Sequence, residues 1–111
     1  MEDKELLELA AKAAGLHVKV ASNHGRGLKV HGNCNWWNPL TDDGDALRLA
    51  VRLGLGILFG QYAPLDVYSV YISKVEGGDE LAVGCITDGD EFGVVRRAIT
   101  RAAAQIGKEM K

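Results

Sequence analysis

Residues 17–41 form a segment rich in side chains that can bind an anion. The segment contains no aspartate or glutamate, although the chain of 111 residues has 15 acidic side chains and a net charge of −2. It holds all three histidines, both tryptophans and three further cationic side chains. Cationic groups attract anions, and an indole ring can stack on a base. The residues predicted to bind an anionic ligand are His17, Lys19, Arg26, Lys29, His31 and Trp36.

Alternation of apolar and polar residues predicts two short strands in this segment, at 16–21 and 28–31, joined by a hairpin. Pairing Val20 with Leu28 keeps the apolar side chains of both strands on one face, whereas a slip of one residue would separate them. This register leaves Asn23-His24-Gly25 as the hairpin loop.

The same register places like charges opposite one another, because Lys19 then faces Lys29 and His17 faces His31. Such pairs are unfavourable across a sheet, and a bound anion would relieve the repulsion. The alternative is a solvated face whose lysines protect an edge strand from aggregation. The hairpin is therefore a candidate anion site on electrostatic grounds.

A second group of reactive side chains is the acidic run that ends at Asp45, where a helix is predicted to begin. Threonine and aspartate are good N-caps, and the helix dipole favours acids in the first turn, so a structural role is sufficient. The alternative is a divalent cation site in a metal-dependent hydrolase or nuclease. The carboxylates that could form it are Asp42, Asp43, Asp45, Asp88 and Asp90. We expect the structural role, and hence no metal.

No motif of a catalytic site accompanies these residues. The chain lacks a glycine-rich phosphate loop and the HExxH and GxSxG patterns. Cys34 and Cys85 lie far apart without CxxC spacing, which predicts free thiols, although a disulfide between them stays open. We expect neither enzymatic activity nor a cofactor.

A mixed framework of helices and strands must position these residues. The spacing of apolar residues and caps predicts eight elements in the order α-β-β-α-β-β-β-α. The later strands are apolar on both faces, which is typical of a sheet covered on both sides. We therefore predict an α+β protein of one domain over residues 1–111, a three-layer α/β/α sandwich around a mainly antiparallel sheet. Beyond the hairpin strands, the elements are helices at 3–14, 43–53 and 91–109 and strands at 55–62, 66–75 and 80–86.

The segment before the second helix is predicted to be structural. Pro39 favours an extended approach to the helix, and Trp37 is expected to be buried beneath it as an anchor. The residues to which we assign this structural role are Trp37, Asn38, Pro39, Thr41 and Asp45.

The run WNPLTDDGDALRLA, from Trp37 to Ala50, resembles the signature of the phage ABA sandwich domain family. The opening run from Glu5 to Gly15 is similar to the start of that family, and Arg96-Arg97-Ala98-Ile99 is similar to its final helix. The resemblance implies the three-layer fold and a phage or prophage origin. It implies no activity.

Composition narrows the remaining function classes. The negative net charge argues against a generic nucleic-acid binder, and no apolar run approaches the roughly 20 residues that span a bilayer. The acidic N-terminus is unlike a signal peptide, so we expect a protein of the bacterial host cytoplasm without a membrane partner. The predicted function is a phage accessory protein that binds an anionic small molecule, such as a nucleotide, or an acidic host protein, and so antagonises a host component. A structural module that forms homo-oligomers is the remaining alternative.

Overall fold

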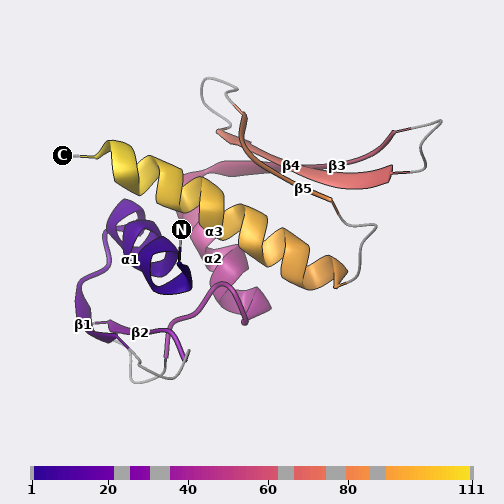
Figure 1. Cartoon of the computed structure of the whole chain (residues 1–111). Helices are drawn as coiled ribbons and strands as arrows, with labels where there is room; N and C mark the ends of the chain where they lie inside the picture. Colours follow the sequence, from indigo (N-terminus) through magenta and orange to yellow (C-terminus); the bar gives the residue numbers. More distant parts are fainter. Residues whose placement is uncertain are drawn as a thin grey trace.

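The computed structural model describes residues 2–21, 26–30, 36–62, 67–74, 80–85 and 90–110. The helices have the bounds predicted from the sequence, and the α+β class and element order are confirmed (Figure 1). Among the described residues, no helix combines the length and apolarity required to cross a membrane. The elements are α1 (Asp3–Ala14), β1 (Val18–Ala21), β2 (Leu28–Val30), α2 (Asp43–Leu53), β3 (Leu55–Tyr62), β4 (Val67–Lys74), β5 (Glu80–Cys85) and α3 (Glu91–Glu109).

The strands form two antiparallel sheets, which differs from the single sheet predicted. One sheet pairs β1 with β2, and the other has the order β3-β4-β5. Figure 1 shows the helices between the two sheets, with α3 packed along β4 and β5. The expected helical cover on both faces of one sheet is therefore corrected to a helical layer with a sheet on either side.

The apolar residues on the two faces of the β3-β4-β5 sheet have different surroundings. Val70, Ile72 and Ala82 are buried, and Gly84 on the same sheet approaches the side chain of Val94 on α3. On the opposite face Leu58 is 67% exposed. The apolar pattern of that face therefore did not indicate a second helical layer.

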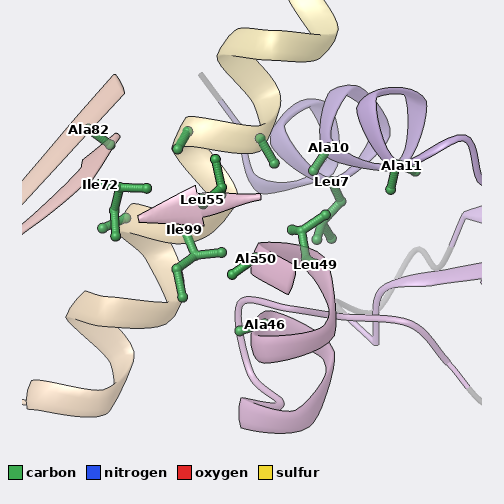
Figure 2. Close-up of a cluster of buried hydrophobic side chains, with 14 of the residues drawn as sticks. Leu7, Ala10, Ala11, Ala46, Leu49, Ala50, Leu55, Ile72, Ala82 and Ile99 are labelled. Carbon is green, nitrogen blue, oxygen red and sulfur yellow. The ribbon is translucent and has the colours of Figure 1, made fainter. Parts of the chain in front are cut away.

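Small side chains allow α1 and α3 to pack closely at the centre of the core. Ala10 and Ala11 on α1 and Ala102 and Ala103 on α3 are fully buried. At Gly107 an added Cβ would lie 2.0 Å from the backbone oxygen of Leu9, so the two backbones nearly touch. Figure 2 shows the larger apolar side chains that complete this core from α1, α2, the β3-β4-β5 sheet and α3. They include Leu7, Leu49, Leu55, Ile72 and Ile99.

The hairpin register differs from the predicted one near the loop. Val18 lies opposite Val30, as the predicted register implied, but a bulge follows, and Val20 then lies opposite Lys29. The predicted pairings of Val20 with Leu28 and of Lys19 with Lys29 are therefore wrong. A bulge places two residues of one strand opposite one of the other.

The opposite edge of β2 explains why β1 accommodates the extra residue. The amide of Leu28 donates to the carbonyl of Trp37 at 2.9 Å, and the amide of Trp37 donates to the carbonyl of Leu28 at 2.7 Å. Because β2 is held there and buries Leu28 and Val30, the irregularity falls in β1. The predicted loop at 23–25 and the pairing of His17 with His31 lie outside the described residues.

Candidate functional site

The structure brings together two of the residues predicted to bind an anion. The ammonium of Lys29 lies 5.1 Å from the centroid of the Trp36 ring, which is a cation–π contact. Both side chains are half-buried, so the contact holds a positive charge against an aromatic surface at the edge of the hairpin.

Three of the other residues predicted to bind the anion lie in the described part of the chain. His17, Lys19 and Arg26 are exposed on or beside the hairpin, and His31 lies outside the described residues. Because Lys29 faces Val20 and not Lys19, repulsion between the two lysines is no longer an argument for an anion. What remains is a basic, acid-free segment that contains the cation–π pair of Lys29 and Trp36.

Trp37 is buried, with 6% of its surface exposed, as predicted. It forms backbone bonds to Leu28 and belongs to the same buried cluster as Leu49 and Ala50 of α2. Pro39 is also fully buried. These contacts fix the approach to α2, which is the structural role that the sequence predicts.

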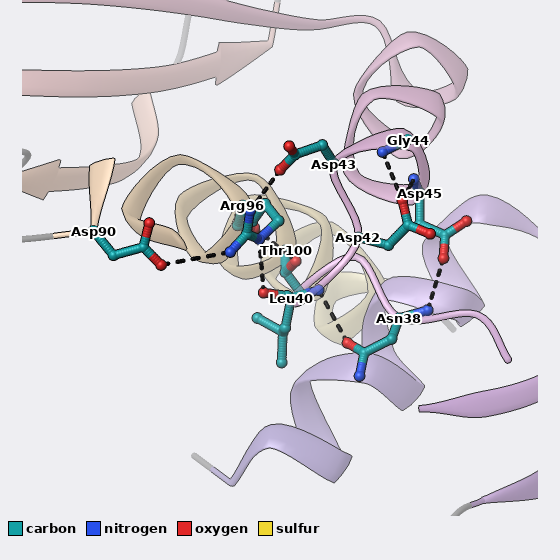
Figure 3. A network of polar contacts seen from close by, with 9 residues as sticks. All are labelled: Asn38, Leu40, Asp42, Asp43, Gly44, Asp45, Asp90, Arg96 and Thr100. Atoms are coloured by element: carbon teal, nitrogen blue, oxygen red, sulfur yellow. Dashed lines mark hydrogen bonds and ion pairs between the residues drawn. The ribbon is translucent and has the colours of Figure 1, made fainter. Parts of the chain in front are cut away.

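Hydrogen bonds connect the segment before α2 to the first turn of the helix (Figure 3). Asp42 is the N-cap, and its Oδ1 accepts from the amides of Gly44 at 2.8 Å and Asp45 at 3.3 Å. The Oδ1 of Asn38 accepts from the amide of Leu40 at 3.0 Å. The amide of Thr41 donates to the carbonyl of Asn38 at 3.2 Å, which closes a turn.

Asp45 is a buried carboxylate whose two oxygens both accept hydrogen bonds. Its Oδ2 accepts from the amide of Asn38 at 3.0 Å, and its Oδ1 accepts from Nη2 of Arg48 at 2.7 Å. The bond to Asp45 raises the pKa of the Arg48 guanidinium above its ordinary value. The carboxylate thus joins the approach segment to α2.

Arg96 on α3 contacts both the segment before α2 and the start of that helix, a role that the sequence did not predict. Its side chain is 17% exposed, and its Nε donates to the carbonyl of Leu40 at 3.0 Å. Its Nη1 lies 2.5 Å from Asp43, and its Nη2 lies 3.6 Å from Asp90 (Figure 3). Arg96 stands four residues before the buried Thr100. This helical spacing is the signal that would have placed Arg96 on the inner face of α3.

These contacts occupy the carboxylates that were the candidates for a cation site. Asp42 caps α2, Asp45 bonds to Asn38 and Arg48, and Asp43 and Asp90 approach Arg96. Among the residues that the structure describes, no group of three or more histidines, cysteines or acids could hold a metal ion. Asp88, the remaining candidate, lies outside the described residues.

A groove with a volume of about 660 Å³ lies beside α2, and we call it the α2 groove. Its lining also includes buried side chains from α1, β2 and the segment before α2. The sequence did not predict this groove, although the apolar pair Leu47 and Val51, four residues apart on α2, was the available signal. The lining includes Ala14, Val30, Trp37, Leu47, Val51 and the charged residues Asp45, Arg48 and Arg52.

No family model, curated protein or solved structure matches this chain.

Proposed function

We propose that this chain is a small phage or prophage accessory protein that binds an anionic ligand without catalysis, through the outer side of the β1–β2 hairpin. The observation that carries the proposal is the cation–π contact of Lys29 with Trp36, at 5.1 Å. It presents an ammonium group beside an aromatic ring on a segment that contains no acid between residues 17 and 41. The host cytoplasm is the compartment that this proposal assumes.

A nucleotide-type molecule suits this arrangement because it combines a phosphate with a planar base. Lys29 and the exposed Lys19 supply positive charge for the phosphate, and the Trp36 ring supplies a surface on which a base can stack. Arg26 and His17 are further exposed groups in the same part of the chain. Sequestration of such a ligand would be the means by which the protein antagonises a host component.

The test is titration calorimetry of the protein against mono-, di- and cyclic nucleotides. The double variant Lys19→Glu with Lys29→Glu should weaken binding by about tenfold or more, because it reverses the charge that meets the phosphate. Affinity of the unaltered protein should fall as salt is raised to about 0.5 M, because exposed charges are screened.

A matched control reverses two lysines that are also exposed but lie on helices. Lys4→Glu with Lys108→Glu changes the net charge by the same amount and should leave affinity nearly unchanged. If both double variants bind alike, the hairpin is not the site. If the unaltered protein binds no nucleotide, the small-molecule ligand is refuted and an acidic host protein takes its place. Turnover of a nucleotide in the presence of Mg²⁺ or Mn²⁺ would contradict the proposal of a non-enzymatic protein.

A further inference from the structure

The α2 groove carries an inference that is independent of the hairpin. We propose that it is a second binding site, and that its ligand is a monomeric amphiphile with an apolar chain and a single carboxylate. Its volume of about 660 Å³ lies within the range of about 300–1,000 Å³ that is usual for small-molecule sites.

The walls of the groove are apolar and come from separate parts of the chain. Ala14 at the end of α1, Val30 of β2 and Trp37 are buried side chains that line it. Leu47 and Val51 on α2 also line it, yet they are 60% and 73% exposed. Large apolar side chains that remain exposed beside a concave surface are typical of a binding site. An apolar ligand would bury these side chains, and this burial would favour its binding.

The charged groups of the groove indicate the head group of the ligand. Arg48 and Arg52 both line it, and they lie four residues apart on α2, so they share one side of the helix. Asp45 is the carboxylate of the lining, but Arg48 and the amide of Asn38 already bond to its two oxygens. One positive charge is in excess, which matches a monoanion, and a guanidinium presents paired donors to a carboxylate.

A hydrogen bond holds the guanidinium of Arg52 at the groove. Its Nε donates to the carbonyl of Ala14, the last residue of α1. This bond connects α2 to α1 beside the groove and leaves the terminal nitrogens of Arg52 as further donors. The groove therefore has a cation held in place at an apolar surface, which is what an amphiphilic carboxylate requires.

The experiment uses decanoate as the probe and decanol as its uncharged counterpart. The protein has two tryptophans, so a Trp36→Phe background leaves Trp37 as the fluorophore that reports on the groove. Decanoate below its micellar concentration should change the Trp37 emission and saturate. Decanol should bind about tenfold or more weakly, because it lacks the charge that meets the arginines.

A double variant in the groove and a single-site control on the sheet separate this groove from other apolar surfaces. Leu47→Glu with Val51→Glu should weaken decanoate binding by about tenfold or more, because both changes repel the carboxylate and remove apolar contacts. Leu58→Glu is the matched control, since Leu58 is similarly exposed but lies on the β3-β4-β5 sheet. It should leave decanoate affinity unchanged, and circular dichroism should show that all variants fold.

The outcomes distinguish this proposal from the hairpin proposal. The Lys19→Glu, Lys29→Glu variant should retain decanoate binding, and the Leu47→Glu, Val51→Glu variant should retain nucleotide binding. Failure of the unaltered protein to bind decanoate, or equal loss in the Leu58→Glu control, overturns the groove site. Sedimentation provides a further test. If the unaltered protein is a dimer and Leu47→Glu with Val51→Glu dissociates it, the groove binds a second copy of the chain and the amphiphile proposal is overturned.

Discussion

Trp37 and Arg96 fix the segment before α2 by different kinds of contact. Trp37 buries its ring in the core and exchanges backbone bonds with Leu28. Arg96 donates to the carbonyl of Leu40 and approaches Asp43 at the start of α2. The segment before α2 is irregular, and both the backbone bonds of Trp37 and the side-chain contacts of Arg96 fix its conformation.

The two adjacent tryptophans should differ in their effect on stability. Trp37→Ala should lower the free energy of unfolding by about 3–5 kcal/mol, the usual cost of removing a buried aromatic ring. Trp36→Ala should cost less, since its ring is half-buried and its cation–π contact contributes about 0.5–1 kcal/mol. Urea denaturation of both variants measures the difference, and equal costs would show that Trp37 is not an anchor.

The adjacent arginines of α3 provide a second comparison. Arg96→Ala should lower the free energy of unfolding by about 1.5–3 kcal/mol, because it removes a charged hydrogen bond to a largely buried site. Arg97 is 49% exposed and pairs with Asp3 on the surface, so Arg97→Ala should cost at most about 1 kcal/mol. The measurement is thermal denaturation of both variants at the same salt concentration. Equal melting temperatures would disprove this role of Arg96.

At the scale of elements, α1 and α3 make the most extensive contact between helices. Fully buried alanines and Gly107 allow it, and surface contacts reinforce it. Arg97 bonds to Asp3 at 3.1 Å, and the ammonium of Lys12 donates to the carbonyl of Met110 at 3.0 Å. Contacts near both ends of α1 thus join the first and last helices in one core.

Substitution of glycine in α3 tests this crossing. Alanine normally stabilises a helix relative to glycine by about 1 kcal/mol, but Gly107→Ala would place a methyl group 2.0 Å from the backbone oxygen of Leu9. We expect a net loss of about 1–3 kcal/mol, the cost of overpacking a core. Gly93→Ala is the control, because the atom nearest to its added methyl is the carboxylate of Asp90, which is 70% exposed and can move. A stabilising effect at Gly107 would contradict the close approach.

At the scale of the whole molecule, the two sheets beside the helical layer differ in the length and regularity of their strand pairing. The β3-β4-β5 sheet contributes Val70 and Ile72 to the core and packs on α3. The β1–β2 sheet consists of short strands, four and three residues long, interrupted by a bulge. The candidate anion site therefore lies on the less extensively paired sheet.

Native-state hydrogen exchange should report this difference. Amides of α3 near Ala102 and Ala103, which are fully buried, should exchange about tenfold or more slowly than the amides of β1, because local opening needs less free energy where fewer contacts are lost. The measurement is exchange followed by nuclear magnetic resonance under native conditions. Equal protection of β1 and α3 would show that the hairpin opens only with the whole domain.

Local signals in the sequence determined the elements of this protein. Helix α2 has the predicted bounds because Asp42 caps its start and Gly54 adopts a left-handed conformation at its end. Both effects depend on residues within a turn of the helix end. The buried position of Trp37 also followed, since it precedes an apolar helix face that needs cover. The anion site remains a prediction. The structure shows that two of the residues predicted to form it, Lys29 and Trp36, are in contact.

Tertiary structure alone decided how these elements meet. The separation into two sheets, the bulge in β1 and the role of Arg96 depend on partners distant in sequence, such as Trp37 beside Leu28 and Leu40 beside Arg96. The α2 groove likewise joins the end of α1, β2 and α2. An alternation of apolar and polar residues indicates which side chains avoid water, but it does not indicate which other segment covers them. That choice is made by packing between distant segments, and it separated the apolar face under α3 from the one that exposes Leu58.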